Sequence, residues 1–404
     1  MSNYSLGTIF ISSDTHKNVR KVLKTARLSY GPFCQDLETR FARLHHTKEA
    51  IVCSSGTAAL HTILTALKIK HGWRDGDEVL VPIVTFVATI NAVLQSGLRP
   101  VFIDILESTY NLDPNLISDK ITAKSKAILP VHLFGKPVDM LSIQQVANNY
   151  HLEIIEDACE TIAAKSQGKS VGSWGVAAAF STNSAHILTT GIGGVITTSD
   201  HQLAELMRSL INHGRDSAYI SIDDDNNLSK PALEKLVQKR FLFNHVGFSY
   251  RLSELEAAVA VSQLNALDKI IKKRVANVRY LNKKFKHLSD LLQLPQLDST
   301  EDHVYLVYPL LLTRKALKKC HIQLNQVINQ LEKAGIETRP FLPILGQPAY
   351  DSLNLNPTDF PIGNYCTQAG FYVGCHQDLT KKDMDYFVNQ LTSALNRLGL
   401  QFAR

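Results

Sequence analysis

Long apolar stretches are missing from this sequence of 404 residues. No run reaches the ~18 consecutive apolar residues that would indicate a membrane-spanning helix. Residues 1–5 also lack the basic and apolar regions of a secretory signal peptide. We therefore expect a cytoplasmic protein that has no membrane partner.

Paired cysteines are missing as well. The chain has six cysteines, and none of them form a Cys-x-x-Cys pair. Their spacing disfavours zinc and iron–sulfur ligation, and in a long cytoplasmic chain free core thiols are expected rather than a disulfide framework. We accordingly expect no metal site. The six residues are Cys34, Cys53, Cys159, Cys320, Cys366 and Cys375.

A strong charge of one sign is also absent. The formal net charge is +6, and the basic residues are spread along the chain in small clusters such as residues 272–274. Solvated helix faces explain such clusters, although a weak attraction for anionic substrates such as nucleotide sugars is compatible with them. Because neither stacking platforms nor a nucleic-acid-binding motif occurs, nucleic acid is not an expected partner.

The pattern that is present alternates strands with helices. Residues 57–67 carry apolar side chains on one helical face, and several short apolar runs follow. Buried strands alternating with helices predict an α/β fold whose mainly parallel central sheet is covered on both faces. The expected strands are residues 78–81, 100–104, 127–131, 153–157, 176–180 and 194–198.

The length and the later pattern predict a large domain over residues 1–260 and a smaller C-terminal α+β domain over residues 261–404. A helical pattern runs from residue 252 to about residue 284 and links the two. Residues 217–243 are polar and irregular, and they are either a substrate lid or a plain surface insertion. The small domain is expected to contain a strand and two helices, at residues 304–312, about 323–334 and about 381–398.

Two segments of the first half combine a strand end with a group that can bind a ligand. In residues 54–60 (Ser-Ser-Gly-Thr-Ala-Ala-Leu), Gly56 permits close approach at a helix N-terminus, where free amides bind phosphate. Thr57 adds a hydroxyl, although Gly-Thr before a helix is also a plain cap. Phe86 follows the strand at residues 78–81 and can stack on a flat ring, although a lone Phe usually fills a core.

Two later segments carry ionisable groups. Asp157 ends a buried strand, so its carboxylate is expected at the sheet edge where α/β folds bind ligands. It can pair with a protonated ring nitrogen, or it is simply an exposed strand-end acid or a helix cap. Residues 180–194 lie between two strands, and His186 is their one ionisable side chain. Three glycines in this stretch indicate a backbone that turns tightly.

The order and spacing of these segments resemble the DegT/DnrJ/EryC1/StrS family of sugar aminotransferases. The resemblance covers nearly the whole chain and implies the aspartate-aminotransferase-like architecture of pyridoxal phosphate (PLP) enzymes of fold type I. It also rests on four further segments: residues 31–32 (Gly-Pro), 130–135 (Pro-Val-His-Leu-Phe-Gly), 212–215 (Asn-His-Gly-Arg) and 247–254 (Gly-Phe-Ser-Tyr-Arg-Leu-Ser-Glu).

The resemblance implies a role for each matching residue. Gly56, Thr57 and Ser181 would hold the cofactor phosphate, and Phe86 would stack on the ring. Asp157 would bind the pyridine nitrogen, which keeps the ring an electron sink.

Three more roles follow from the same resemblance. Glu160 stands where many members have Gln, near the ring hydroxyl. Ser249 and Arg251 would reach the cofactor phosphate of a neighbouring subunit, so a homodimer is expected; many relatives have Asn in place of Ser249.

His186 is the main departure from the family pattern. Family aminotransferases have their Schiff-base lysine there, five residues after the serine and five before the first glycine, and a histidine cannot form that bond. The cofactor is then expected to be held non-covalently, in part as the amine form, PMP. Imidazole titrates near neutrality, so His186 can still move protons. Lys165 and Lys169 are near in sequence but fall in an expected surface turn.

This substitution resembles the sugar 3-dehydratase branch of the family. The resemblance implies that L-glutamate converts PLP to PMP, and that PMP reacts with the C4 ketone of a nucleotide-linked 4-keto-6-deoxyhexose. His186 would then move the proton that allows the C3 hydroxyl to leave, and hydrolysis would release ammonia and a 3-deoxy sugar. Deoxysugar synthesis for surface glycans, such as lipopolysaccharide, or for antibiotics is the expected setting.

Two other hypotheses stay open, a nucleotide-sugar aminotransferase and a PLP-binding protein without catalytic activity. An iron–sulfur branch of the family has clustered cysteines after its Gly-Arg-Asp segment, whereas here no cysteine follows Asp216 until Cys320. Ile192 stands where many relatives have Glu, and the sequence does not explain it.

Overall fold

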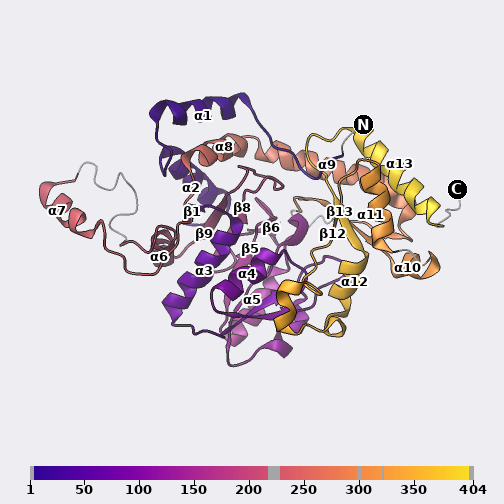
Figure 1. Ribbon diagram of the computed structural model, residues 1–404, viewed down its shortest axis with the longest axis horizontal. Coiled ribbons are helices and arrows are strands. Elements are labelled where there is room, and N and C mark those ends of the chain that lie inside the picture. The colour runs from indigo at the N-terminus through magenta and orange to yellow at the C-terminus, as the bar shows by residue number, and fades with distance from the viewer. Residues whose placement is uncertain (1–3, 217–227, 298–302, 321–322, 400–404) are drawn as a thin grey trace.

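The computed structural model describes residues 4–216, 228–297, 303–320 and 323–399. Its larger part is built on a seven-stranded sheet in the order β1-β9-β8-β5-β4-β2-β3 (Figure 1). Only β9 runs antiparallel to its neighbours, which confirms the predicted mainly parallel sheet. The strands are β1 (Glu49–Cys53), β2 (Glu78–Pro82), β3 (Arg99–Ile103), β4 (Ser125–Ile128), β5 (Glu153–Asp157), β8 (Ala177–Ser181) and β9 (Gly194–Thr198).

Both faces of this sheet are buried because neighbouring residues of a strand point to opposite sides. Leu80, Ile128 and Ile154 pack with α5 in one apolar cluster. Val81 and Ile155 belong to a second cluster, which contains the apolar face of α3. The helices of this part are α1 (Ser13–Thr25), α2 (Pro32–Leu44), α3 (Gly56–His71), α4 (Val87–Gln95), α5 (Met140–Tyr150) and α6 (His201–Ile211).

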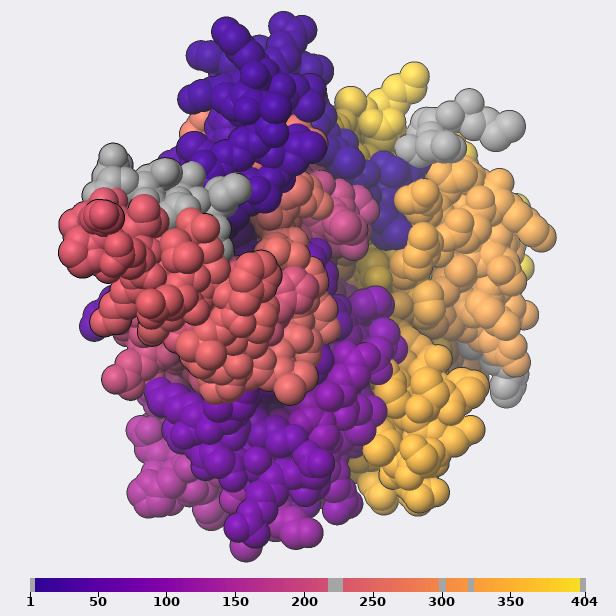
Figure 2. Space-filling model, turned by 60° about the vertical axis from the view of Figure 1, so that its left-hand side comes forward, coloured from indigo at the N-terminus to yellow at the C-terminus, as the bar shows by residue number. Residues whose placement is uncertain are grey.

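The smaller part carries a four-stranded antiparallel sheet in the order β10-β11-β13-β12. It forms the orange and yellow lobe beside the purple and magenta part in Figure 2. The strands are β10 (Leu292–Gln293), β11 (Tyr308–Leu312), β12 (Arg339–Pro340) and β13 (Gly370–Val373). The helices are α10 (Arg314–Cys320), α11 (Leu324–Lys333), α12 (Pro361–Ala369) and α13 (Lys381–Arg397).

Two separate helices connect the two parts, whereas the sequence predicted one continuous helical segment. α8 (Glu254–Leu264) starts at the Ser253 capping box and packs on α1 and α2, and α9 (Leu267–Phe285) follows after Asn265 and Ala266. Asn has a low helix propensity because its side chain competes for backbone hydrogen bonds, so a break at Asn265 costs little.

The beginning of the described chain lies against the small sheet (Figure 1). Tyr4 forms a parallel bridge with Ile336, and its hydroxyl donates to the carbonyl of Gly374 at 2.9 Å. The smaller lobe therefore contains a contribution from the N-terminal segment that the sequence did not indicate. The boundary between residues 260 and 261 stays a proposal.

α7 (Lys230–Lys239) projects away from the sheet, at the far left of Figure 1. Residues 217–227 of the expected lid or insertion lie outside the described residues. Within the described ranges, no helix has the length and apolar character needed to span a membrane.

Candidate active site

A cavity of about 560 Å³ lies where the carboxyl ends of the large sheet face the small sheet. Such sheet edges are the usual ligand sites of α/β folds, and the volume lies in the range of small-molecule sites. The cavity collects seven of the nine residues predicted for cofactor binding: Gly56, Thr57, Phe86, Asp157, Glu160, Ser181 and His186.

The N-terminus of α3 forms one wall of the cavity. Ser55 caps this helix by accepting a hydrogen bond from the amide of Ala58 at 3.0 Å. The amides of the first helical turn, including those of Gly56 and Thr57, have no acceptor within the helix and are available to an anion. A Cβ on Gly56 would lie 2.8 Å from the Cβ of Ser181, so only glycine lets these two walls approach.

Asp157 ends β5 and its side chain is almost completely buried. Its Oδ2 accepts a hydrogen bond from Thr89 Oγ1 at 2.7 Å, and its Oδ1 accepts from the amide of Cys159 at 3.1 Å. These two bonds fix the carboxylate plane. A rigid acid at this place can hold a cationic ring nitrogen.

The residue before Asp157 anchors the end of the strand. The fully buried carboxylate of Glu156 accepts from the amides of Gly172, Trp174 and Gly175 at 2.7–2.9 Å. Burial alone would raise the pKa of Glu156, but the hydrogen bonds from His132 and these amides lower it. The anion is therefore stable inside the protein, and it keeps the end of β5 in place.

Phe86 precedes the first residue of α4, and its side chain remains 55% exposed although it is large and apolar. It lines the cavity instead of filling the core, which was the alternative for a lone Phe. An exposed aromatic ring at a cavity wall is available to stack on a ligand ring.

Glu160 also lines the cavity. Its Oε2 accepts from the amide of Phe134 at 2.7 Å. Burial, and then the nearby Asp157 carboxylate, raise the pKa of Glu160 to about 7. Glu160 can therefore be a proton donor or an acceptor at neutral pH.

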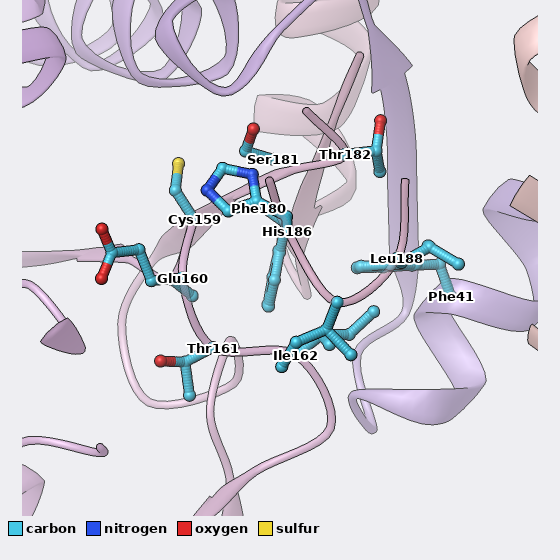
Figure 3. Close-up of a pocket in the computed structure, with 12 residues that line it drawn as sticks. Phe41, Cys159, Glu160, Thr161, Ile162, Phe180, Ser181, Thr182, His186 and Leu188 are labelled. Atoms are coloured by element: carbon cyan, nitrogen blue, oxygen red, sulfur yellow. The ribbon is translucent and has the colours of Figure 1, made fainter. Parts of the chain in front are cut away.

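His186 lies in the turn after β8, beside Cys159 and Ser181 (Figure 3). Its amide donates to the carbonyl of Asn183 at 2.9 Å, which closes the turn. The Nδ1 atom is buried and has no hydrogen-bond partner among the described residues. Burial, and then the charge of Arg274, lower the pKa of His186 to about 4, so the ring is neutral at neutral pH and can accept a proton.

The loop after this turn is shaped by glycine. Gly191 has φ +93° and Gly193 has φ +151°, which side-chain-bearing residues rarely adopt. Thr190 Oγ1 donates to the carbonyl of Ile192 at 2.7 Å, and the exposed Ile192 side chain lines the cavity.

Lysine is absent from the described residues that line the cavity. Lys165 and Lys169 lie on a two-stranded hairpin, β6 (Lys165–Ser166) and β7 (Lys169–Ser170), and both are exposed. Lys169 Nζ lies 4.5 Å from the ring of Trp174. The surface turn predicted for these two lysines is therefore present, and neither lysine lines the cavity.

Ser249 and Arg251 do not line the cavity of their own chain. Arg251 donates to Ser249 Oγ at 2.7 Å and to Asn212 Oδ1 at 3.3 Å, and it contacts His213. The four side chains form a polar cluster in which Asn212 is buried and the other three are exposed. Their expected contact with the phosphate of a neighbouring subunit stays a proposal.

Sequence reasoning missed two kinds of site residue. Thr89 orients Asp157, and its position one helical turn after Thr85 and near Phe86 was an available signal. Arg339 and Tyr372 line the cavity from the small sheet, and no local pattern marks them.

Comparison with known proteins identifies the family. The model of the DegT/DnrJ/EryC1/StrS aminotransferase family matches residues 10–392. The chain belongs to this family. The GDP-perosamine synthase of Caulobacter vibrioides is 35% identical to it over 368 residues, 91% of each chain. The GDP-4-keto-6-deoxy-D-mannose 3-dehydratase of Escherichia coli O55:H7 is 27% identical over 394 residues, 96% of this chain and 98% of that one.

Solved structures of DegT-family members share the fold. That of the E. coli GDP-4-keto-6-deoxy-D-mannose-3-dehydratase with bound hydrated PLP has a TM-score of 0.84 at 26% identity. The match covers 97% of this chain and 100% of that chain. The chain therefore has the fold of PLP fold-type I sugar aminotransferases, and it is an enzyme of a PLP-dependent family.

The residues of this DegT-family cavity fit PLP. The amides at the start of α3 and the Ser181 hydroxyl suit a phosphate, the exposed Phe86 ring suits a flat ring, and Asp157 suits its nitrogen. The close approach of Gly56 to Ser181 leaves a cradle that a Cβ would fill. What the cavity lacks, within the described chain, is a lysine to hold the cofactor covalently.

Proposed function

We propose that this chain is a PLP- and PMP-dependent 3-dehydratase of a nucleotide-linked 4-keto-6-deoxyhexose, with L-glutamate as the amine donor. The observation that carries the proposal is His186. This proton-accepting side chain stands where family aminotransferases have lysine, and no lysine occurs among the described residues that line the cavity. The E. coli dehydratase relative, whose match covers 96% of this chain, supports the same class of reaction.

Each cavity residue has a task in this proposal. The bound cofactor supplies an electron sink, and the substrate's C4 ketone is the point at which the sugar joins it. Asp157 holds the ring nitrogen in its cationic form, and Phe86 covers the ring face. The neutral His186 imidazole would accept the proton from the cofactor's C4′ carbon, so that the electron pair left behind can expel the C3 hydroxyl.

The alternative is a nucleotide-sugar aminotransferase, which the name of the Caulobacter relative favours. An aminotransferase must release an aminated sugar from the cofactor, and lysine at residue 186 would normally do so by imine exchange. Because His186 cannot exchange the amine covalently, we rank this function second. A PLP-binding protein without activity ranks third, because the residues of the cofactor site are kept together in one cavity.

The products separate these functions. We expect the purified enzyme with PLP, ¹⁵N-labelled L-glutamate and GDP-4-keto-6-deoxymannose to release ¹⁵N-ammonia and a sugar that lacks the C3 oxygen, as seen by mass spectrometry. Label in the sugar, with no ammonia, would show the aminotransferase instead. If both products are absent with GDP-, UDP- and dTDP-linked keto sugars alike, the protein is not an enzyme of either kind.

Glu160 is assigned to the ring hydroxyl, where its protonated form can donate a hydrogen bond to an anionic ring oxygen. Since the pKa of Glu160 is about 7, we expect PLP affinity to weaken as the pH rises through neutrality. Glu160→Gln keeps a donor at every pH, so this part of the pH dependence should disappear in fluorescence titrations. The difference between the two proteins isolates Glu160, because the PLP phosphate titrates in both; identical profiles would remove this role.

A homodimer is also proposed, with Ser249 and Arg251 near the cofactor phosphate of the partner subunit. An exposed apolar surface next to this cluster supports it: Phe241 is 83% exposed and Val246 is 94% exposed. The red ridge on one side of Figure 2 contains this segment. A surface of this kind is typical of a protein–protein interface.

Sedimentation velocity tests the homodimer. The wild type is expected to sediment as a dimer and the Phe241→Asp/Val246→Asp double variant as a monomer, because two buried charges at an interface are costly. Leu141→Asp on α5 is the matched control, since Leu141 is also exposed but lies on another element. A monomeric wild type would rule out the proposed assembly.

A further inference from the structure

Arg339 provides a positive charge on the small-sheet wall of the cavity. It begins β12, the edge strand of the small sheet, and its side chain is exposed. No lysine or second arginine occurs among the described residues that line the cavity, whereas Asp157 and Glu160 supply carboxyl groups. Arg339 is therefore the cationic feature that an entering anion would meet.

The guanidinium of Arg339 is available to a ligand. Its NH1 donates to the carbonyl of Thr338 at 2.6 Å, and no ion pair to Arg339 occurs within residues 4–216, 228–297, 303–320 and 323–399. A guanidinium has five N–H donors in a planar fork, so most of them remain free for carboxylate or phosphate oxygens.

The wall that carries Arg339 is held firmly. Pro343 forms an antiparallel bridge with Val84, and the amide of Phe341 donates to the carbonyl of Gly370 at 3.0 Å. Arg339 lies directly opposite Tyr372 in the β12–β13 register, and both side chains line the cavity. The phenol hydroxyl of Tyr372 can thus act beside the guanidinium as a second donor.

The cofactor phosphate has its own cradle on another wall, at the start of α3 and at Ser181. The cofactor phosphate therefore does not need Arg339, and the charge of Arg339 is available for a second anion. We propose that Arg339, assisted by Tyr372, is the substrate-anion residue of the cavity and binds an oxygen-bearing anion: the carboxylate of the amine donor or the diphosphate of the nucleotide sugar. This inference rests on the proposed function and names a residue that recognises its substrates.

Calorimetric titration of the PLP-loaded full chain tests this inference without turnover. Glutarate is the carboxylate probe because it has no amine to transfer, and GDP-mannose is the diphosphate probe because it has no ketone. We expect Arg339→Gln to weaken binding of at least one probe by roughly 10- to 100-fold, the range for a hydrogen bond between charged groups. If only glutarate binding is weakened, Arg339 binds the carboxylate of the amine donor. If only GDP-mannose binding is weakened, Arg339 binds the diphosphate of the nucleotide sugar.

Two further variants sharpen the test. Arg279→Gln on α9 removes an exposed arginine outside the cavity and should leave both affinities unchanged. Arg339→Lys keeps the charge but not the planar fork, and it should restore part of the lost affinity.

If the Arg339→Gln variant binds both probes as tightly as the wild type does, the inference is overturned, whether or not the wild type releases ammonia. Wild-type protein that binds neither probe would also overturn it. Wild-type ammonia release then decides separately whether the proposed function stands.

Discussion

Replacing His186 by asparagine is expected to lower kcat by about 100- to 10,000-fold, the usual contribution of a positioned acid–base group. Asparagine is close to histidine in size but cannot accept a proton. The affinity for PLP should stay within a few-fold of the wild-type value, because the phosphate cradle and Asp157 are unchanged. Steady-state ammonia release gives kcat, and fluorescence titration gives the PLP affinity.

The control for this variant is Asn183→Ala. Asn183 also lies in the turn after β8, and its side chain accepts from the amide of Ala185 at 3.3 Å. If the geometry of the turn were the cause, both variants would lose activity to a similar extent. Unchanged kcat in His186→Asn would remove this side chain from the mechanism.

The second large effect is expected at Asp157. Asp157→Asn keeps the size of the side chain and an acceptor for Thr89, but it removes the negative charge that stabilises a cationic ring nitrogen. We expect kcat to fall by about 100- to 1,000-fold, the size typical of losing one preorganised electrostatic contact. The PLP affinity should fall as well, which distinguishes this variant from His186→Asn.

Thr89→Val separates the charge of Asp157 from its orientation. It removes the hydroxyl that donates at 2.7 Å but leaves the carboxylate charged. A smaller loss than in Asp157→Asn is therefore expected in the same kinetic assay. If Asp157→Asn binds PLP and turns over like the wild type, the carboxylate does not hold the ring nitrogen.

Much of this site could be predicted because it depends on local patterns. Asp157 ends a buried strand, so its carboxylate was expected at the sheet edge where α/β folds bind ligands. The places of Phe86 and Ser181 beside the cofactor were implied by the family resemblance. The structure brings all three to one cavity. Gly56 was predicted from its place before a helix, and its close contact with Ser181 explains why a side chain would not fit there.

The remaining features depend on contacts between distant segments. Arg339 and Tyr372 reach the cavity only because the small sheet packs over the large one, and no local spacing encodes that packing. The raised pKa of Glu160 comes from burial, which the sequence does not give. The same holds for the N-terminal segment, where Tyr4 pairs with Ile336 across most of the chain.

The central claim is that His186 replaces the cofactor-linking lysine and that no other lysine takes over. Borohydride reduction of the PLP-loaded protein, followed by intact-mass measurement after denaturation, tests it most directly, because reduction makes a lysine–PLP link permanent. The account predicts an unchanged mass for the wild type and a gain of one reduced cofactor in His186→Lys. A wild-type protein that gains the cofactor mass would mean that another lysine forms the link, and it would contradict the claim.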